Sequence, residues 1–291
     1  MNGLRHIAMV ILLAIGMSRL CSGSDTGEQR TIVTTFYPMQ IAVLNVAAGV
    51  EGIRVLNLAA PSTGCLHDYQ LTPRDRATLS KADVVVANGA GMESFLKEVG
   101  QGRSEVNVID ASAGIHLLIT GGETNSHLWV SPSRHIQQVQ SIVEGLAKWD
   151  PGHAQQYRDN GRRYIRDLES LKVKMAAGLK DVKVRDIVTL HEAFPYFADE
   201  FGLRVVAVIE REPGAEPSAG ELATLIRTVR ENGVRALFVE PQYSVKAAET
   251  INRATGAGLY TLDPMVSGPV ETKAYFKVMT RNLAELQRAL K

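Results

Sequence analysis

Residues 71–86 read LTPRDRATLSKADVVV, and residues 216–239 read EPSAGELATLIRTVRENGVRALFV. In both stretches a proline-containing turn leads into a helical pattern, and a short apolar run then follows as a buried strand. The two stretches stand in opposite halves of the chain and share one supersecondary plan. This internal echo predicts two similar lobes.

The regions around the echo extend the same pattern. Short apolar runs alternate with helical spacing in both halves, and they lie at 31–36, 53–58, 83–87, 106–109, 187–190, 205–209 and 236–239. Such alternation is typical of a parallel sheet with helices on its faces. Within it we expect helices to start near Thr72 and to span 92–99 and 194–201. The predicted fold class is therefore α/β, with a mainly parallel sheet flanked by helices in each lobe.

A charged helical stretch from Ser133 to about Leu179 separates the two halves. It is interrupted once, at Asp150-Pro151-Gly152, and it lacks the Gly/Ser composition of a flexible hinge. We expect a long rigid helix that joins the lobes, with a peripheral helix of the second lobe as the alternative. The predicted division is a signal peptide at 1–24, an N-terminal metal-binding lobe at 25–135, a linking helix at 136–180 and a C-terminal metal-binding lobe at 181–291.

The first residues have the composition of an export signal. Arg5 precedes an apolar run from Ile7 to Met17, which is too short to cross a bilayer. We expect export and a periplasmic protein. A lipoprotein anchor on Cys21 is the less favoured alternative, because Arg19 and Leu20 occupy positions where such a site needs small residues.

Composition excludes several partners and reactions. The chain has 291 residues, 45% of them hydrophobic and 22% charged, and 32 Lys and Arg against 31 Asp and Glu give a net charge of +1. We therefore expect no nucleic-acid partner, and we expect a monomer. No G-x-S-x-G, P-loop or dinucleotide motif is present, so we expect no enzyme of those classes.

The histidines are the candidates for chemistry. Of seven, His6 lies in the leader, and the surroundings of three others predict surface positions: His116, His135 and His153. The remaining three, His67, His127 and His191, each lie near the end of a predicted strand or in the loop beyond it. An open α/β sheet binds its ligands at that edge.

Three imidazoles and one carboxylate would satisfy a tetrahedral zinc ion. Asp263, in Leu262-Asp263-Pro264, is the best candidate for the carboxylate. The alternative is that Asp263 only forms the turn before the proline. Ligands so far apart in the sequence form no short motif, so their spacing alone is weak evidence for a zinc site.

At these residues the sequence resembles the zinc- and manganese-binding solute-binding proteins of ABC transporters, the cluster A-I or ZnuA-like group. The segment from Pro61 to Pro73 resembles that family's Pro, turn, His-Asp-Tyr, Pro pattern. His127-Leu128-Trp129-Val130-Ser131-Pro132 is similar to Asp-Pro-His-x-Trp-x-Asp-Pro, and residues 191–197, HEAFPYF, resemble the third ligand segment. The resemblance covers nearly the whole chain from Thr31 onward.

The resemblance implies a binding protein whose cargo is a metal ion and whose partner is the membrane permease of an ABC transporter. It implies His67, His127, His191 and Asp263 as ligands. Glu240 then stands behind them, with direct coordination as its alternative. Histidine rather than glutamate at the third position favours zinc over manganese, although copper and nickel would also bind such a site in vitro.

This chain departs from the family pattern in four places. Cys65 stands where a small residue or proline is usual; a thiolate ligand is conceivable there, but we favour a small buried loop residue. Ser126 and Ser131 replace the usual Pro and Asp around the second histidine. The long His- and acid-rich loop of many zinc-binding members is absent before His127, where Glu123 and the turn Gly121-Gly122 remain.

Two other functions stay open. One is a zinc hydrolase, in which the three histidines leave the fourth position to water and Glu192 or Glu240 acts as general base. The other is a surface adhesin, a role that the resemblance allows and that no residue specifies. The fourth ligand separates binding from hydrolysis, because a protein side chain in that position closes the site to water.

Overall fold

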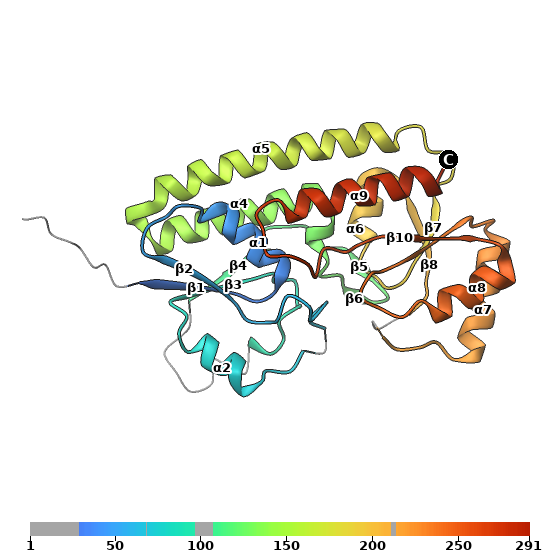
Figure 1. Cartoon of the computed structure of the whole chain (residues 1–291), viewed down its shortest axis with the longest axis horizontal. Coiled ribbons are helices and arrows are strands. Elements are labelled where there is room, and N and C mark those ends of the chain that lie inside the picture. Colours follow the sequence, from blue (N-terminus) through green and yellow to red (C-terminus); the bar gives the residue numbers. More distant parts are fainter. Residues whose placement is uncertain (1–28, 68, 97–106, 211–213) are drawn as a thin grey trace, which may run out of the picture.

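The computed structural model describes residues 29–67, 69–96, 107–210 and 214–291, and within them the chain forms two four-stranded parallel sheets flanked by helices (Figure 1). The first sheet has the order β2-β1-β3-β4. Its strands are β1 (Arg30–Thr34), β2 (Ile53–Asn57), β3 (Val84–Ala87) and β4 (Val108–Asp110). The second sheet has the order β10-β9-β7-β8. Its strands are β7 (Asp186–Thr189), β8 (Arg204–Val208), β9 (Ala236–Val239) and β10 (Gly258–Thr261).

The two sheets share one topology. In each, the first strand along the chain pairs with the second on one side and with the third on the other, and the fourth strand lies outside the third. The prediction of two similar α/β lobes is confirmed.

The echoed helices begin in the same way. The flanking helices of the two lobes are α1 (Tyr37–Val46), α2 (Pro73–Leu79), α6 (Pro195–Phe201), α7 (Ala219–Glu231) and α8 (Lys246–Thr255). At α2 the Thr72 hydroxyl accepts a hydrogen bond from the backbone N–H of Asp75, and at α7 the Ser218 hydroxyl accepts one from Glu221. Each acidic side chain accepts from the capping residue's backbone in return. The repeated sequence pattern thus encodes the same capping box at the start of both helices.

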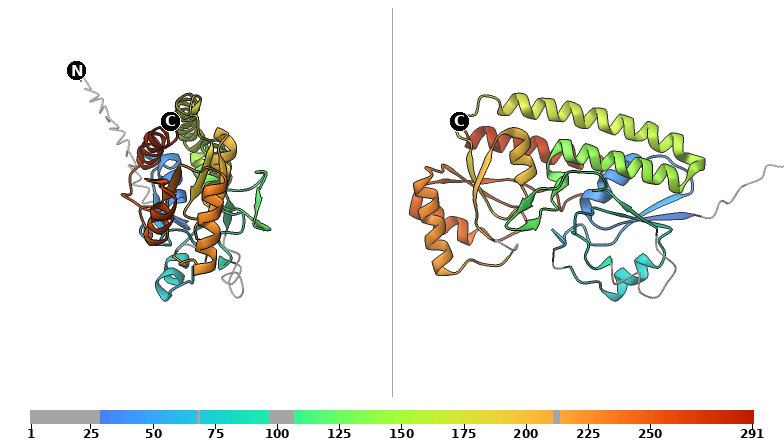
Figure 2. Two further views of the ribbon diagram at one scale, coloured as in Figure 1. Left: turned by 90° about the vertical axis from the view of Figure 1, so that its right-hand side faces the viewer. Right: turned by 180° about the vertical axis from the view of Figure 1, so that it is seen from behind.

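A pair of long helices runs along one long edge of the molecule. These are α4 (Pro132–Trp149) and α5 (Ala154–Leu179), with the short 3-10 turn η2 (Pro151–His153) at the predicted interruption. Figures 1 and 2 show α5 running along both lobes, above α4 on one side and above α9 (Ala274–Ala289) on the other. The long joining helix is present as expected. The domain boundaries at 135 and 180 stay a prediction.

Buried hydrogen bonds fix the C-terminal segment against the first lobe. The indole Nε1 of Trp129 donates to the carbonyl of Pro264 (2.7 Å), and the Tyr275 hydroxyl donates to the carbonyl of Trp129 (2.9 Å). The Tyr37 hydroxyl donates to the carbonyl of Pro269 (2.7 Å). Because α9 also packs on α1 and α5, one apolar core extends through both lobes, and a second apolar cluster lies within the C-terminal lobe. This continuous packing opposes a wide hinge motion.

Several details differ from expectation or add to it. The described residues 92–95 form turns, and the rest of the helix expected at 92–99 lies mostly outside the described residues, as does the signal peptide at 1–24. The turn Gly121-Gly122 joins the hairpin β5 (Ile119–Thr120) and β6 (Glu123–Thr124), and both glycines have the positive φ that such a tight turn requires. Among the described residues, no helix combines the length and apolarity needed to cross a membrane.

One expectation about the histidines is wrong. His116 is exposed, as predicted, but His135 is only 1% exposed. Its ring stacks on Tyr275 with centroids 4.4 Å apart, and its Nε2 lies 3.2 Å from the Tyr164 hydroxyl. The polar composition of α4 concealed this position, because His135 lies on the buried face of an amphipathic helix.

Burial lowers the pKa of His135 from 6.5 to about 4. The unfolded chain therefore takes up a proton that the folded chain excludes, and the free energy of unfolding falls as the pH drops from about 6.5 to about 4. A shift of this size corresponds to about 3 kcal/mol. We predict that the stability difference between the natural protein and His135→Phe changes by about that amount between pH 7 and pH 4.

Urea unfolding at both pH values, with a chelator present, measures this difference. His116→Phe is the matched control, because it makes the same replacement at an exposed histidine. A His135→Phe difference that does not change with pH would contradict the prediction.

Candidate metal centre

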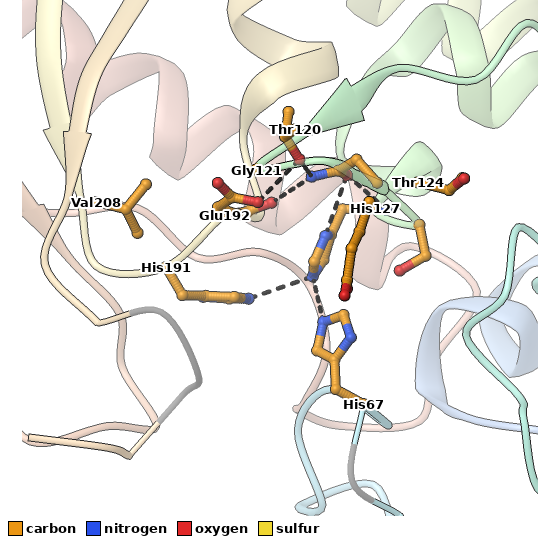
Figure 3. Close-up of a pocket in the computed structure, with 11 residues that line it drawn as sticks. His67, Thr120, Gly121, Thr124, His127, His191, Glu192 and Val208 are labelled. Carbon is orange, nitrogen blue, oxygen red and sulfur yellow. Dashed lines mark hydrogen bonds between the residues drawn. The ribbon is translucent and has the colours of Figure 1, made fainter.

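Four side chains from three places in the sequence converge on one point. The ligand atoms of Cys65, His67, His127 and His191 all lie within 4.8 Å of one another. Cys65 and His67 come from the loop between β2 and α2, His127 directly precedes the 3-10 helix η1 (Leu128–Val130), and His191 follows β7. Figure 3 shows the three imidazole rings pointing toward one another.

The nitrogen separations match those of a tetrahedral zinc site. His127 Nε2 lies 3.1 Å from His67 Nε2 and 3.3 Å from His191 Nε2. With Zn–N bonds of about 2.0–2.1 Å, tetrahedral geometry separates two nitrogens by about 3.3–3.4 Å. Three imidazole nitrogens at this spacing can share one cation.

Two of the rings are held with Nε2 facing the cluster. Nδ1 of His191 donates to the Glu240 carboxylate (2.5 Å), and Nδ1 of His127 donates to Oδ1 of Asn125 (3.2 Å). A carboxylate or amide oxygen can only accept, so these bonds place the proton on Nδ1 and leave the Nε2 lone pair for a metal. This outer partner is typical of metal-binding histidines. Glu240 therefore lies behind His191, where the sequence analysis placed it.

Asn125 is itself fixed by both lobes. Its amide donates to the backbone carbonyl of Glu192 (2.9 Å) and to the Thr120 hydroxyl (3.2 Å). The Thr120 hydroxyl in turn donates to the Glu192 carboxylate (2.8 Å), and the Tyr196 hydroxyl donates to the Asn125 carbonyl (2.8 Å). These bonds hold the segment that carries His127 against the segment that carries His191.

Burial and neighbouring charges set the proton affinities. Burial, with the charges of His191 and His67, holds the pKa of His127 well below its usual value. Burial also acts to lower the pKa of His191, but the Glu240 carboxylate and Cys65 outweigh it and raise this pKa. Burial raises the pKa of the Cys65 thiol. A metal ion therefore meets a neutral His127 and displaces protons from His191 and Cys65.

The cluster is accessible from one side. His127 and His191 are 2% and 1% exposed, whereas His67 is exposed. All three histidines line a cavity of about 370 Å³, which the β5–β6 hairpin and Glu192 border. A cation can reach the ligands from the His67 side without moving the buried rings.

Asp263 lies elsewhere than in this four-residue cluster. Its Oδ1 accepts from the backbone N–H of Met265 (2.8 Å), and its Oδ2 lies 3.6 Å from an Arg281 nitrogen. The Asn282 side chain holds the Asp263 backbone N–H and carbonyl. In this structure Asp263 anchors the loop after β10 to α9. Its role as a ligand stays a prediction.

Cys65 is the member of the cluster that the sequence analysis disfavoured. Its Sγ lies 3.5 Å from His191 Nε2 and 3.7 Å from His127 Nε2. A signal was available, because residues two apart face the same side of an extended chain, so Cys65 and His67 could reach one point. The sequence does not show that His127 and His191 reach the same point, because only the folded chain brings them there.

Comparisons with known proteins agree with this architecture. Residues 32–289 match the model of the family described as zinc-uptake complex component A, periplasmic. The chain belongs to this family. A relative in Bacillus subtilis (strain 168), the high-affinity zinc uptake system protein ZnuA, is 30% identical over 99% of this chain and 97% of its own length. The chain spans 57% of the zinc-binding lipoprotein AdcA of Streptococcus pneumoniae, which it also matches.

Solved structures show the same fold. The solute-binding protein FpvC from Pseudomonas aeruginosa in complex with Mn²⁺ is 30% identical, with a TM-score of 0.82 over 90% of this chain and 98% of that one. The laminin-binding protein Lmb of Streptococcus agalactiae, described as having adhesin and metal-transporting activity, is 28% identical. Its TM-score is 0.81 over 90% of this chain and the whole of that one. The family is one of solute-binding proteins.

The contact between Glu240 and His191 leads to a prediction for metal affinity. Glu240→Gln removes the charge that orients and polarises the imidazole, so zinc affinity should fall about 10–100-fold. Competition with a chromogenic chelator measures the change. Glu210→Gln is the matched control, because Glu210 is equally buried at 2% exposure but accepts from the backbone of Gly214. Equal affinities of the two variants would contradict this role of Glu240.

Proposed function

We propose that this protein captures one zinc ion with His67, His127 and His191 outside the cytoplasm and delivers it to the membrane permease of an ABC importer. One observation carries the proposal: three Nε2 atoms lie 3.1 and 3.3 Å apart, with the buried rings held by Asn125 and Glu240. Such a preformed donor set binds a metal with little reorganisation.

The donor types favour zinc over manganese. Imidazole nitrogen suits zinc, whereas manganese prefers carboxylate, carbonyl and water oxygen. The name of the Bacillus subtilis relative supports zinc, and the Mn²⁺ complex of FpvC keeps manganese as the alternative. The nitrogen-rich cluster of this chain decides the order of preference.

Binding is favoured over hydrolysis because Glu240 has both carboxylate oxygens engaged and Glu192 has one oxygen held by the hairpin. The Glu240 carboxylate accepts from His191 through Oε1 and from Gln242 through Oε2 (3.0 Å). The Glu192 carboxylate accepts from Thr120, which holds it against the hairpin. A general base must reach a metal-bound water with an available oxygen. We therefore propose that the zinc ion is cargo and that the protein is no enzyme.

The helices that join the two lobes suggest how the zinc ion leaves the site. Because α5 and α9 pack along both lobes, we propose that docking on the permease moves the exposed loop of His67 rather than opening a wide hinge. The leader favours release into the periplasm, with a lipid anchor at Cys21 as the alternative, and we propose that the protein acts as a monomer. An adhesive role, as described for Lmb, has no separate feature in this chain to support it.

Zinc titration of the purified protein against a chelator tests the site. We expect about one high-affinity zinc ion per chain. The triple variant His67→Ala, His127→Ala, His191→Ala should lose this binding, because a lone cysteine cannot hold the ion in its place. The control is the double variant His116→Ala, His153→Ala, which removes two histidines outside the cluster and should bind as the natural protein does.

Near-normal zinc binding by the triple variant would overturn the site. Metal analysis of protein recovered from its native compartment then tests the choice of metal. Manganese in place of zinc would overturn that part of the proposal.

A further inference from the structure

We infer that Cys65 supplies the fourth ligand, so that the cargo is held by one thiolate and three imidazoles. The inference rests on the proposed metal-binding function and goes beyond it in naming the ligand that closes the site. It replaces the oxygen donor at Asp263 with a sulfur donor, which strengthens the preference for zinc over manganese.

The sulfur lies where a tetrahedral zinc site needs it. Zn–S bonds of about 2.3 Å and Zn–N bonds of about 2.0–2.1 Å separate sulfur and nitrogen by about 3.5–3.6 Å. The observed distances from Cys65 Sγ are 3.5 Å to His191 Nε2 and 3.7 Å to His127 Nε2. The sulfur thus lies at coordination-shell separations from the His127 and His191 nitrogens, and a ligand atom of His67 lies within 4.8 Å of it.

The loop that carries Cys65 is built to place it there. Gly64 has φ of +84°, and a Cβ at this position would lie 2.9 Å from the Tyr243 hydroxyl oxygen. Tyr243 follows β9 in the second lobe, and its hydroxyl hydrogen-bonds the Cys65 backbone. Only glycine allows this conformation and this approach without strain. The second lobe therefore braces the cysteine loop of the first.

The two carboxylates that the sequence analysis considered as ligands, Glu240 and Asp263, have other partners. Glu240 is committed to His191 and Gln242, and Asp263 to Met265 and Arg281. Among the described residues, the hydrogen-bonding contacts of the Cys65 thiol are with His127 and His191. When the metal binds, the thiol proton passes to water and the sulfur lone pair forms the bond to the ion.

A thiolate changes the preference among metals. Sulfur suits zinc and other thiophilic ions and is a poor donor for manganese. The Cys-His₃ set should therefore discriminate against manganese more strongly than three histidines with a carboxylate. It also leaves no ligand position for water, which separates this site further from a catalytic one.

Cobalt(II) substitution tests the inference. All proteins carry Cys21→Ser, so that Cys65 is the only thiol. The variants are Cys65→Ser, Cys65→Asp and the matched carboxylate control Asp263→Asn. The measurements are the near-ultraviolet thiolate-to-cobalt charge-transfer band, and zinc and manganese affinities by chelator competition.

We expect the parent protein and Asp263→Asn to show the band and to prefer zinc. Cys65→Ser should lose the band and should lose more zinc affinity than the roughly 10–100-fold that removal of an outer partner costs. Cys65→Asp should regain metal binding with a smaller preference for zinc over manganese, as expected for an oxygen donor.

The parent spectrum decides the inference even if a variant fails to fold. A cobalt complex of the parent protein without the thiolate band overturns Cys65 as a ligand while leaving metal binding intact. Loss of zinc affinity in Asp263→Asn alone would do the same. A parent protein that binds neither zinc nor cobalt would instead overturn the proposed function.

Discussion

The meeting of three imidazole nitrogens around His127 is the constraint on which the site depends. His127 is buried and has a strongly lowered pKa, and its Nε2 lies at 3.1 and 3.3 Å from two other ring nitrogens. Without a metal, nitrogens this close in a medium of low polarity must share a proton to avoid repulsion between their lone pairs, and a cation takes the place of that proton. The surrounding hydrogen bonds keep the rings in place for that cation.

The rest of the structure supplies the stiffness that this arrangement needs. Parallel sheets bring the ends of their strands to one edge, and α5 with α9 fixes the two edges relative to each other through a continuous core. Trp129 adds a direct tie, because its indole reaches Pro264 across the junction. A ligand set divided between two lobes can hold a small ion only if the lobes are positioned this firmly.

The donor set also connects structure to selectivity. Nitrogen and sulfur donors favour zinc-like ions, and the hydrogen bonds of Glu240 and Asn125 set the tautomers that make the imidazoles donors. The open side at His67 then gives the ion an entry path and leaves one exposed ligand for release. The held rings of His127 and His191 thus provide metal affinity, and the exposed His67 allows the metal ion to enter and leave.

The sequence by itself determined the local structure and the candidate histidines. The capping residues Thr72 and Ser218 and the apolar runs act on their immediate neighbours, so the echoed lobes and the long helix could be predicted. His67, His127 and His191 could be named because their segments resemble a family. Only the tertiary structure decided that His135 is buried, that Cys65 joins the three histidines and that Asp263 caps its own loop. These outcomes depend on contacts between residues far apart in the chain, and local sequence patterns carry no distance between such residues.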